Sequence, residues 1–394
     1  MGKLSPESGW SGWSGWSGWS GWSGWSGWSG WSGWSGWSGW SGWGGGPATP
    51  EALVTNRDGI VGHWQPPAVT PPQMPFDDPA NLARWEPRAR AAAIDSEVFS
   101  RLGFTASASG GVKRVAVHHL AQSGSAPAYK PLVEMTRPDE AAFKRQLDFL
   151  DRYAELRGDR GPEILSQMPG GIAFFAAIGF VNPDRTPKTV ELLDAANRLT
   201  VFVEMRFKHV LACRRPLEYS PQVQPMIPTP SHSAFPSGHS TESFTAALVL
   251  WMLLRDAGIA PYRDVMWGDQ FMLQASRIAV NRTVAGVHFP IDSAAGAMLG
   301  LTLGRYFINR ATAGTNYEAW TFDSAKFPDG TSDDPQLDGD FYWRALYDVD
   351  GKPNPKQVGP KAPNDYAASG GTQPLAGDSP MLAWLWNKAK AEWT

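Results

Sequence analysis

The chain has 394 residues, and its 35 Lys and Arg residues nearly balance 38 Asp and Glu residues, which gives a formal net charge of −3. A general nucleic-acid binder would carry a basic excess, so the charge balance argues against that class. The single cysteine, Cys213, excludes an intrachain disulfide framework and also zinc or iron–sulfur sites built from several cysteines.

The first 46 residues are of low complexity, because residues 8–43 repeat the tripeptide Ser-Gly-Trp and three glycines follow. Gly and Ser leave the backbone free, and neither a helical nor a strand period is present, so residues 1–46 are predicted to form a flexible tail. The alternative interpretation is an assembly or surface-binding module, since Trp combines a large apolar area with a hydrogen-bond donor. Residues 47–78 are rich in proline and are predicted to form a non-helical arm.

From residue 79 onwards the pattern of apolar residues favours helices. Apolar side chains spaced by three and four predict a helix over residues 139–157. Thr186 followed by Pro187 predicts the start of a long helix that continues to Val210. Further helices are predicted over residues 239–256, 261–286 and 290–310, and a short one after Ser379-Pro380.

Few strand patterns are visible, and residues 312–378 are rich in turn-forming residues. We therefore predict an all-α fold with a helical bundle core, in one domain over residues 79–394 whose central part is 186–310. No apolar stretch reaches the ~20 residues that span a bilayer, and no secretory signal follows Met1. A soluble protein is expected, with export to the periplasm left open, and the helix rich in Ala and Gly over 290–303 permits a homodimer or a larger homo-oligomer.

Cationic residues recur in two of three short segments that stand out for their chemistry. Lys208 and Arg215 are seven residues apart, two turns of a helix, so both side chains can point the same way. Arg282 follows later in the chain. The planar arginine fork matches the geometry of an oxyanion, and lysine adds a point charge. Three cations brought together therefore predict a pocket for a tetrahedral or trigonal-bipyramidal oxyanion.

Histidines and a helix start accompany these cations. Ser237 and Gly238 precede a predicted helix, where free backbone N–H groups favour an anion and glycine allows close approach. His239 and His288 would flank the pocket, and a neutral imidazole can attack phosphorus or ligate a metal oxyanion. Asp292, four residues after His288, is placed to hold the other ring nitrogen of His288 and to fix its tautomer.

Taken in order, the three segments read Lys-x6-Arg-Pro, Pro-Ser-Gly-His and Arg-x5-His-x3-Asp. This set resembles the signature shared by type-2 phosphatidic acid phosphatases, bacterial class A acid phosphatases and vanadium-dependent haloperoxidases. One position departs from the signature: Asn281 stands where the family usually has Ser before the Arg. Ser276-Arg277 is a decoy, that is, a Ser-Arg pair that does not match the signature, because its Arg is eleven residues before His288 instead of six.

The resemblance implies roles for these residues. His239 would be the general acid and base, and His288 would be the vanadium ligand in a haloperoxidase or the phosphorylated nucleophile in a phosphatase, oriented by Asp292. Lys208 would hold the oxyanion and polarise bound peroxide. The remaining oxyanion-binding residues would be Arg215, Ser237, Gly238 and Arg282.

Among the groups that share this signature, the chain is interpreted as a soluble, bacterial-type vanadium-dependent haloperoxidase. Such an enzyme uses vanadate and hydrogen peroxide to oxidise bromide, iodide or chloride to hypohalous acid. His232, seven residues before His239, supports this interpretation, since bromoperoxidase-type members look similar there, and it is a candidate tuning residue together with Phe235. The 43 residues from His239 to Arg282 favour the alternative or a compact bacterial form. That alternative is an acid phosphatase that hydrolyses phosphate monoesters through a phosphohistidine and needs no cofactor.

Overall fold

The computed structural model describes residues 59–122, 126–328, 339–346 and 366–393. The chain divides into two compact units, Met1–Pro75 and Phe76–Thr394. The predicted Ser-Gly-Trp tail, residues 1–46, and the first part of the Pro-rich arm lie outside the described residues. Within the first unit, the described residues 59–75 are exposed. The second unit carries the helices and strands described below.

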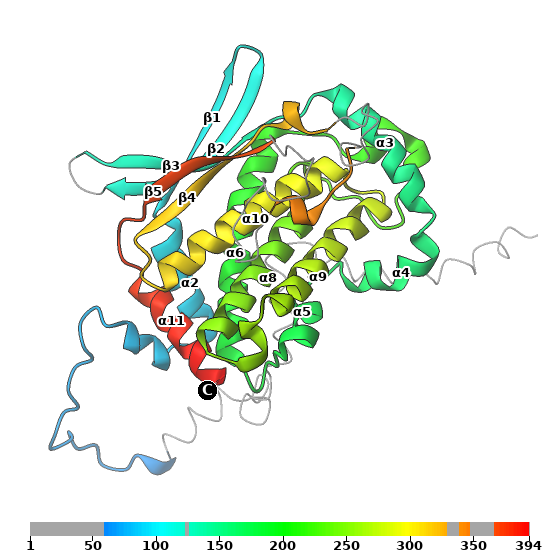
Figure 1. The fold of residues 1–394 in the computed structure, drawn as a ribbon. Coiled ribbons are helices and arrows are strands. Elements are labelled where there is room, and N and C mark those ends of the chain that lie inside the picture. Colours follow the sequence, from blue (N-terminus) through cyan, green and yellow to red (C-terminus); the bar gives the residue numbers. More distant parts are fainter. Residues whose placement is uncertain (1–58, 123–125, 329–338, 347–365, 394) are drawn as a thin grey trace, which may run out of the picture. The chain divides into compact units, whose positions relative to one another are not determined.

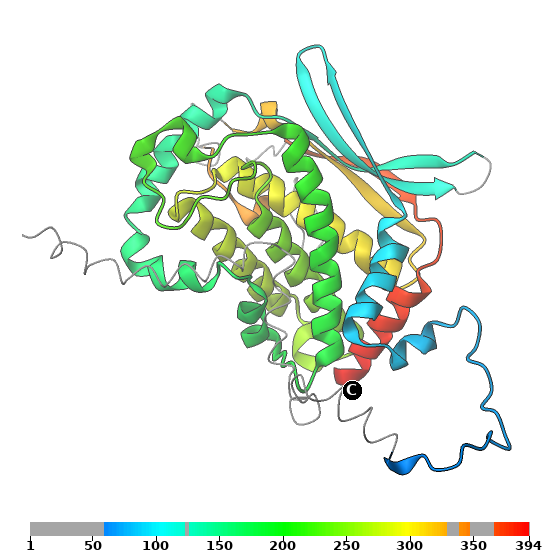
Figure 2. The same cartoon turned by 180° about the vertical axis from the view of Figure 1, so that it is seen from behind.

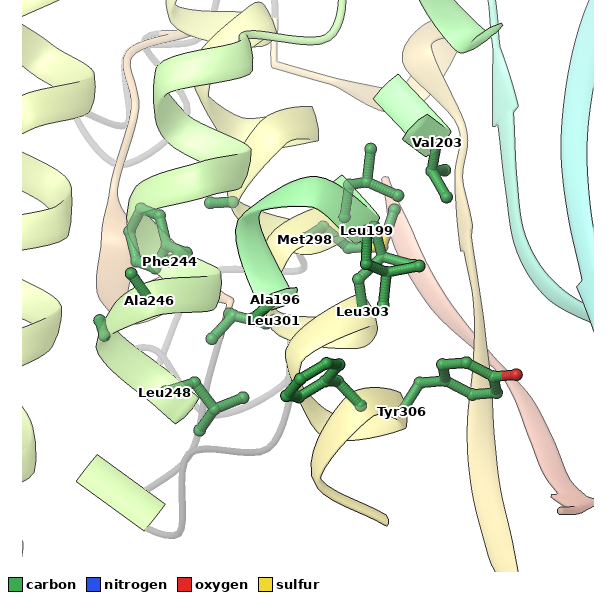
Figure 3. Close-up of a cluster of buried hydrophobic side chains, with 14 of the residues drawn as sticks. Ala196, Leu199, Val203, Phe244, Ala246, Leu248, Met298, Leu301, Leu303 and Tyr306 are labelled. Carbon is green, nitrogen blue, oxygen red and sulfur yellow. The ribbon is translucent and has the colours of Figure 1, made fainter. Parts of the chain in front are cut away.

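Four long helices form the centre of the second unit (Figure 1). They are α6 (Pro187–Leu211), α8 (Gly238–Asp256), α9 (Val265–Val284) and α10 (Pro290–Ala311). Helix α8 packs against the other three and is apolar on most faces, as expected of a central helix. Side chains of α6, α8 and α10 meet in the core shown in Figure 3, among them Leu199, Val203, Phe244, Leu248, Met298 and Leu301.

Shorter helices surround this centre. Figure 2 shows α2 (Pro87–Phe99) and α11 (Pro380–Lys390) beside α6. Three further helices contact α9, namely α3 (Glu140–Ala154), α4 (Arg157–Ser166) and α5 (Ile172–Gly179). The short helix α7 (Pro216–Tyr219) follows α6. The 3₁₀ turns are η3 (Pro79–Arg84), η4 (Pro221–Val223), η5 (Ala260–Arg263), η6 (Ser324–Lys326), η8 (Trp343–Ala345) and η9 (Ala391–Trp393).

Local sequence explains most helix starts. Asp139 accepts a hydrogen bond from the Ala142 N–H at 2.6 Å and so caps α3. Pro187 lies in the first turn of α6, as predicted, but the cap itself comes from far along the chain. The Glu392 carboxylate accepts hydrogen bonds from the N–H groups of Lys188 and Thr189, at 2.6 and 2.8 Å. The predicted cap, Thr186, instead bonds the Asn182 carbonyl through its hydroxyl.

A five-stranded sheet shows that the predicted all-α fold is wrong. Its strands are β1 (Leu102–Ser109), β2 (Val112–Gln122), β3 (Ala128–Thr136), β4 (Asn316–Phe322) and β5 (Ala367–Pro374), in that spatial order. The β3–β4 pair is parallel and the others are antiparallel. The chain is therefore a mixed helix-and-sheet protein in which strands from both ends of the second unit meet. Residues 312–378, rich in turn-forming residues, contribute β4 and β5.

The sheet lies against α6 and α10 (Figure 1), and His119 on β2 reaches into the contact. Its ring is fully buried, with Nδ1 3.0 Å from the Tyr306 hydroxyl and Nε2 accepting a hydrogen bond from the Ala376 N–H at 3.1 Å. Because Nε2 must accept, the proton sits on Nδ1 and is donated to Tyr306. Burial, with a smaller contribution from Arg310, lowers the pKa of His119 to about 4.

This pKa shift predicts acid sensitivity. Because the pKa of His119 is near 6.5 in the unfolded chain, the stability it contributes is complete above pH 6.5 and is lost as the pH falls towards 4. We expect the free energy of unfolding, measured by urea titration, to fall by about 2 kcal/mol between pH 7 and pH 4.5 because of His119 alone. The variant His119→Gln should show a shallower pH dependence than the parent. Parallel curves for parent and variant would show that His119 does not contribute.

No helix within the described residues is both long enough and apolar enough to cross a membrane.

Candidate functional site

The turn that opens α8 provides the first part of the site. Ser237 is buried, and its side chain accepts a hydrogen bond from the Ser240 N–H at 3.4 Å, so it caps the helix. The Ser237 N–H donates to the Asp292 carbonyl at 2.9 Å, which fixes this turn against the start of α10. Gly238 and His239 follow at the start of α8, where backbone N–H groups lack helical partners.

Lys208 and Arg215 do not lie on one helix, contrary to the two-turn argument from their spacing. Helix α6 ends at Leu211, and the next residue, Ala212, adopts a left-handed conformation with φ of 48°. Lys208 occupies the last turn of α6, where its Nζ donates to the carbonyls of Ser233 and Ala234, both at 3.3 Å, and of Pro236. The lysine therefore holds the loop that leads into α8.

Arg215, His288 and Asp292 form a connected, buried group. The Nδ1 atom of His288 is 3.0 Å from Asp292 Oδ2, and its Nε2 is 2.9 Å from Arg215 Nη1. Because a guanidinium can only donate, Nε2 must be the acceptor, and the proton of the neutral ring therefore lies on Nδ1 and faces the carboxylate. The single lone pair of Nε2 therefore accepts this hydrogen bond and points at the cationic side of the site.

Arg282 supplies N–H groups that nothing described occupies. Its side chain is 1% exposed, and its Nη2 donates to Gln167 Oε1 at 2.8 Å. Its Nε and Nη1 are buried, and among the described residues neither has a hydrogen-bond partner, and the same holds for Nε2 of His239. Buried donors without partners cost free energy, so the Nε and Nη1 groups of Arg282 are expected to bind a ligand that accepts hydrogen bonds.

Electrostatics point to an anion as that ligand. Burial lowers the pKa of Lys208 to about 8, with Arg215 adding to the shift, and lowers the pKa values of Arg215 and Arg282 to about 10. The pKa of His239 falls to about 3, first through burial and then through Arg282, and that of His288 falls well below its usual value. Both rings are thus neutral at neutral pH, and a bound anion would stabilise the concentrated positive charge.

Comparison with known proteins agrees with this geometry. Residues 193–313 match the model of the PAP2 superfamily. The chain contains a PAP2 superfamily domain. A curated relative, the decaprenylphosphoryl-5-phosphoribose phosphatase of Mycobacterium tuberculosis, is 27% identical over 159 residues, which is 40% of this chain and 82% of the relative. The match is the same for the strains CDC 1551 / Oshkosh and ATCC 25618 / H37Rv.

The PAP2 domain contains all the site residues predicted from the sequence, and the structure brings them close together. His232, a predicted tuning residue, lies beside Arg215, with its Nδ1 3.2 Å from Arg215 Nη2. Phe235, the other, is fully buried, and its ring centroid is 5.8 Å from that of Phe322 on β4. Arg277, the decoy, lies apart on the exposed side of α9, where it pairs with Glu163.

Two buried residues of the site were missed in the sequence. Glu204 lies one turn before Lys208 on α6, and a methyl group on Gly238 would come within 2.7 Å of its Oε1. Burial, and then Glu242, raise the pKa of Glu204 to about 8. The spacing of four before Lys208 is a signal that could have found it. The other missed residue, Gln167, lies outside the residues matched to the PAP2 domain, and no spacing points to it.

A cavity of about 400 Å³ borders the site on the α6 side. Its lining includes Lys208 and His232 together with the exposed His209, but neither His239 nor His288. Cys213 also lines it, and burial raises the pKa of this thiol to about 12. A thiol with a raised pKa stays protonated, so Cys213 is not a reactive nucleophile at neutral pH.

Proposed function

We propose that this protein hydrolyses phosphate monoesters through a phosphohistidine formed on His288. The observation that carries the proposal is the fixed tautomer of His288, which presents a lone pair on Nε2 beside Arg215 while Asp292 holds the opposite nitrogen. The relative named as a phosphatase supports the same class of reaction. This proposal replaces the haloperoxidase as the main interpretation, because neither comparison refers to halide oxidation.

The reaction divides into two displacements at phosphorus. The Nε2 lone pair of His288 gives up its hydrogen bond from Arg215 and attacks phosphorus while the ester oxygen leaves. His239, protonated when the anionic substrate is bound, gives that oxygen its proton. Arg215 and the N–H groups of Arg282 stabilise the charge on the three oxygens that remain. His239 then takes a proton from a water molecule that attacks the phosphohistidine, which releases phosphate and restores His288.

Asp292 supports both steps without touching phosphorus. Its Oδ2 accepts hydrogen bonds from His288 Nδ1 and from the Phe289 N–H at 2.9 Å. When Nε2 bonds to phosphorus the ring becomes cationic, and the carboxylate then stabilises it. Burial raises the pKa of Asp292, while the Phe289 N–H and the nearby cations oppose that shift. The positive charge that forms on His288 also lowers the pKa of Asp292. The carboxylate is therefore ionised in the intermediate and stabilises it.

Vanadate-dependent halide oxidation is the second candidate, and the position of His232 beside Arg215 favours it. Vanadate is tetrahedral like phosphate, and the donors of Arg282 without partners fit either oxyanion. His288, Arg215, Arg282, Ser237 and Gly238 would hold it. Bound vanadate would supply a Lewis-acid centre for the oxidation of halide by hydrogen peroxide.

One titration of the full chain separates the two candidates. We expect hydrolysis of p-nitrophenyl phosphate that vanadate inhibits competitively, because both oxyanions occupy the same donors. The matched assay follows bromination of phenol red with vanadate, bromide and hydrogen peroxide, against free vanadate as the background. Bromination above that background without hydrolysis of the phosphate ester would reverse the order of the candidates.

A further inference from the structure

Gln167 is a fully buried glutamine directly after helix α4, outside residues 193–313 of the PAP2 domain. A buried amide costs free energy unless all its polar groups are paired, so the partners of such a side chain are informative. Here the partners lead to the site. The glutamine reaches it from a segment that the three sequence motifs do not include.

The amide of Gln167 holds Arg282 in place. Its Oε1 accepts hydrogen bonds from Arg282 Nη2 at 2.8 Å and from Asn281 Nδ2 at 3.0 Å. Its Nε2 donates to Glu163 Oε1 at 2.9 Å, so the amide cannot flip without losing all three bonds. With Nη2 engaged in this way, the Nε and Nη1 groups of Arg282 are the ones left for a ligand.

Glu163 anchors the amide in turn. Its carboxylate accepts hydrogen bonds from Arg277 Nε and Nη2, the shortest at 2.6 Å, and another from Asn281 Nδ2 at 3.0 Å. Asn281, the departure from the family pattern, therefore has a structural account. Its longer amide bonds both Glu163 and Gln167, and its Oδ1 accepts from Arg160 Nη1 at 3.0 Å.

The main chain of the same residue contacts His239. Hydrogen bonding with the Gln167 backbone acts to raise the pKa of His239, against the larger lowering effect of burial. Nε2 of His239 is buried and has no hydrogen-bond partner among the described residues. A neutral ring with its proton on Nδ1 would leave Nε2 to exchange a proton with substrate.

We infer that Gln167 is a positioning residue that aligns the oxyanion-binding Arg282 with the acid and base His239. Its side chain fixes Arg282, and hydrogen bonding with its backbone acts on His239. The PAP2 domain alone does not supply this link, so the segment from α4 to α5 completes the site. The inference rests on the proposed function only for the roles of Arg282 and His239, since the contacts themselves are independent of the reaction.

The test is a double-mutant cycle on the full chain with Gln167→Met and Arg282→Met. Methionine keeps the length of glutamine but accepts no hydrogen bond of useful strength. We expect Q167M to lower kcat/KM for p-nitrophenyl phosphate and to weaken binding of inorganic phosphate, measured by calorimetry, each by about 10-fold to 100-fold, as for other partners that orient a ligand-binding group. In the Arg282→Met background, the same change should have less than about a threefold effect.

Several outcomes decide the inference. Equal losses from Q167M with and without Arg282 would overturn it, because the two residues would then act independently. Gln274→Met, on the same helix as Arg282 but without a site contact, is the matched control and should bind phosphate like the parent. If Q167M does not fold, a double variant of Gln167→Glu and Glu163→Gln takes its place. The carboxylate at position 167 still accepts from Arg282, and the amide at position 163 removes the repulsion between two carboxylates. This double variant should retain phosphate binding, and a loss would overturn the inference. If the parent binds phosphate but hydrolyses no ester, the proposed function fails, and the cycle on phosphate binding still tests Gln167.

Discussion

Replacing His288 by Ala is expected to reduce phosphate-ester hydrolysis at least about a thousandfold in kcat, because the attacking atom itself is removed. His288 is 3% exposed, and a methyl group cannot replace its hydrogen bonds with Arg215 and Asp292. Binding should suffer less, since the arginines remain, so kcat should fall much more than KM rises. Steady-state kinetics with p-nitrophenyl phosphate provide the measurement.

Two controls make the result specific to chemistry. His63→Ala removes an exposed histidine from the other compact unit and should leave kcat unchanged. Rapid quenching of the parent enzyme with radiolabelled substrate should trap a phosphorylated protein whose label survives alkali but not acid, as expected for phosphohistidine, and the label should be missing in H288A. If H288A keeps more than about a tenth of the parent kcat at an equal melting temperature, the nucleophile is another group.

The proximity of the candidate site residues could be predicted from the sequence because much of their geometry is local. His288 and Asp292 are four residues apart, and the helix start between them brings ring and carboxylate to 3.0 Å. Ser237 caps the helix that carries His239, so one short segment fixes two site residues. These contacts depend on turns and first helical turns, which spacing predicts well.

The sheet could not be predicted because its pairing is not local. In β2 the buried residues Val115, Ala116 and Val117 are consecutive, so the expected alternation is lost, and β5 contains two glycines in the middle. The parallel pair places Val133 opposite Trp320, far apart in the chain. Such pairing depends on the assembled helices, and no periodicity within either strand indicates the partner.

Gln167 shows the same limit for the site. Its partners Asn281 and Arg282 are more than a hundred residues later, and nothing in the surrounding sequence distinguishes it from an exposed glutamine after a helix. Similarly, the hydrogen bonds that Lys208 Nζ donates to the carbonyls of Ser233 and Ala234 are not indicated by any spacing in the sequence. Residue types and spacing indicate which groups serve a site. Which partner each group takes depends on side chains that meet only in the folded chain.

Gly300→Ala is expected to destabilise the protein although alanine is the better helix former. Three glycines, Gly296, Gly300 and Gly304, recur every four residues on α10 and face α8. A methyl group on Gly300 would meet the carbonyl oxygen of Thr241 and lie 3.2 Å from Phe244 Cβ. The first of these atoms belongs to the backbone of a buried helix, so relief requires the two helices to move apart.

The balance of two effects sets the size of this loss. Exchanging Gly for Ala inside a helix gains about 1 kcal/mol, whereas overpacking against atoms that cannot move costs about 3 kcal/mol or more. We therefore expect the free energy of unfolding to fall by about 2 kcal/mol in Gly300→Ala and further in Gly300→Val, measured by urea titration. Gly158→Ala is the matched control, because this exposed glycine of α4 has no atom within 4 Å of an added methyl group, so the helical gain should appear alone. If both alanine variants were stabilised alike, α8 and α10 would not be in the close contact that brings Ser237 to Asp292.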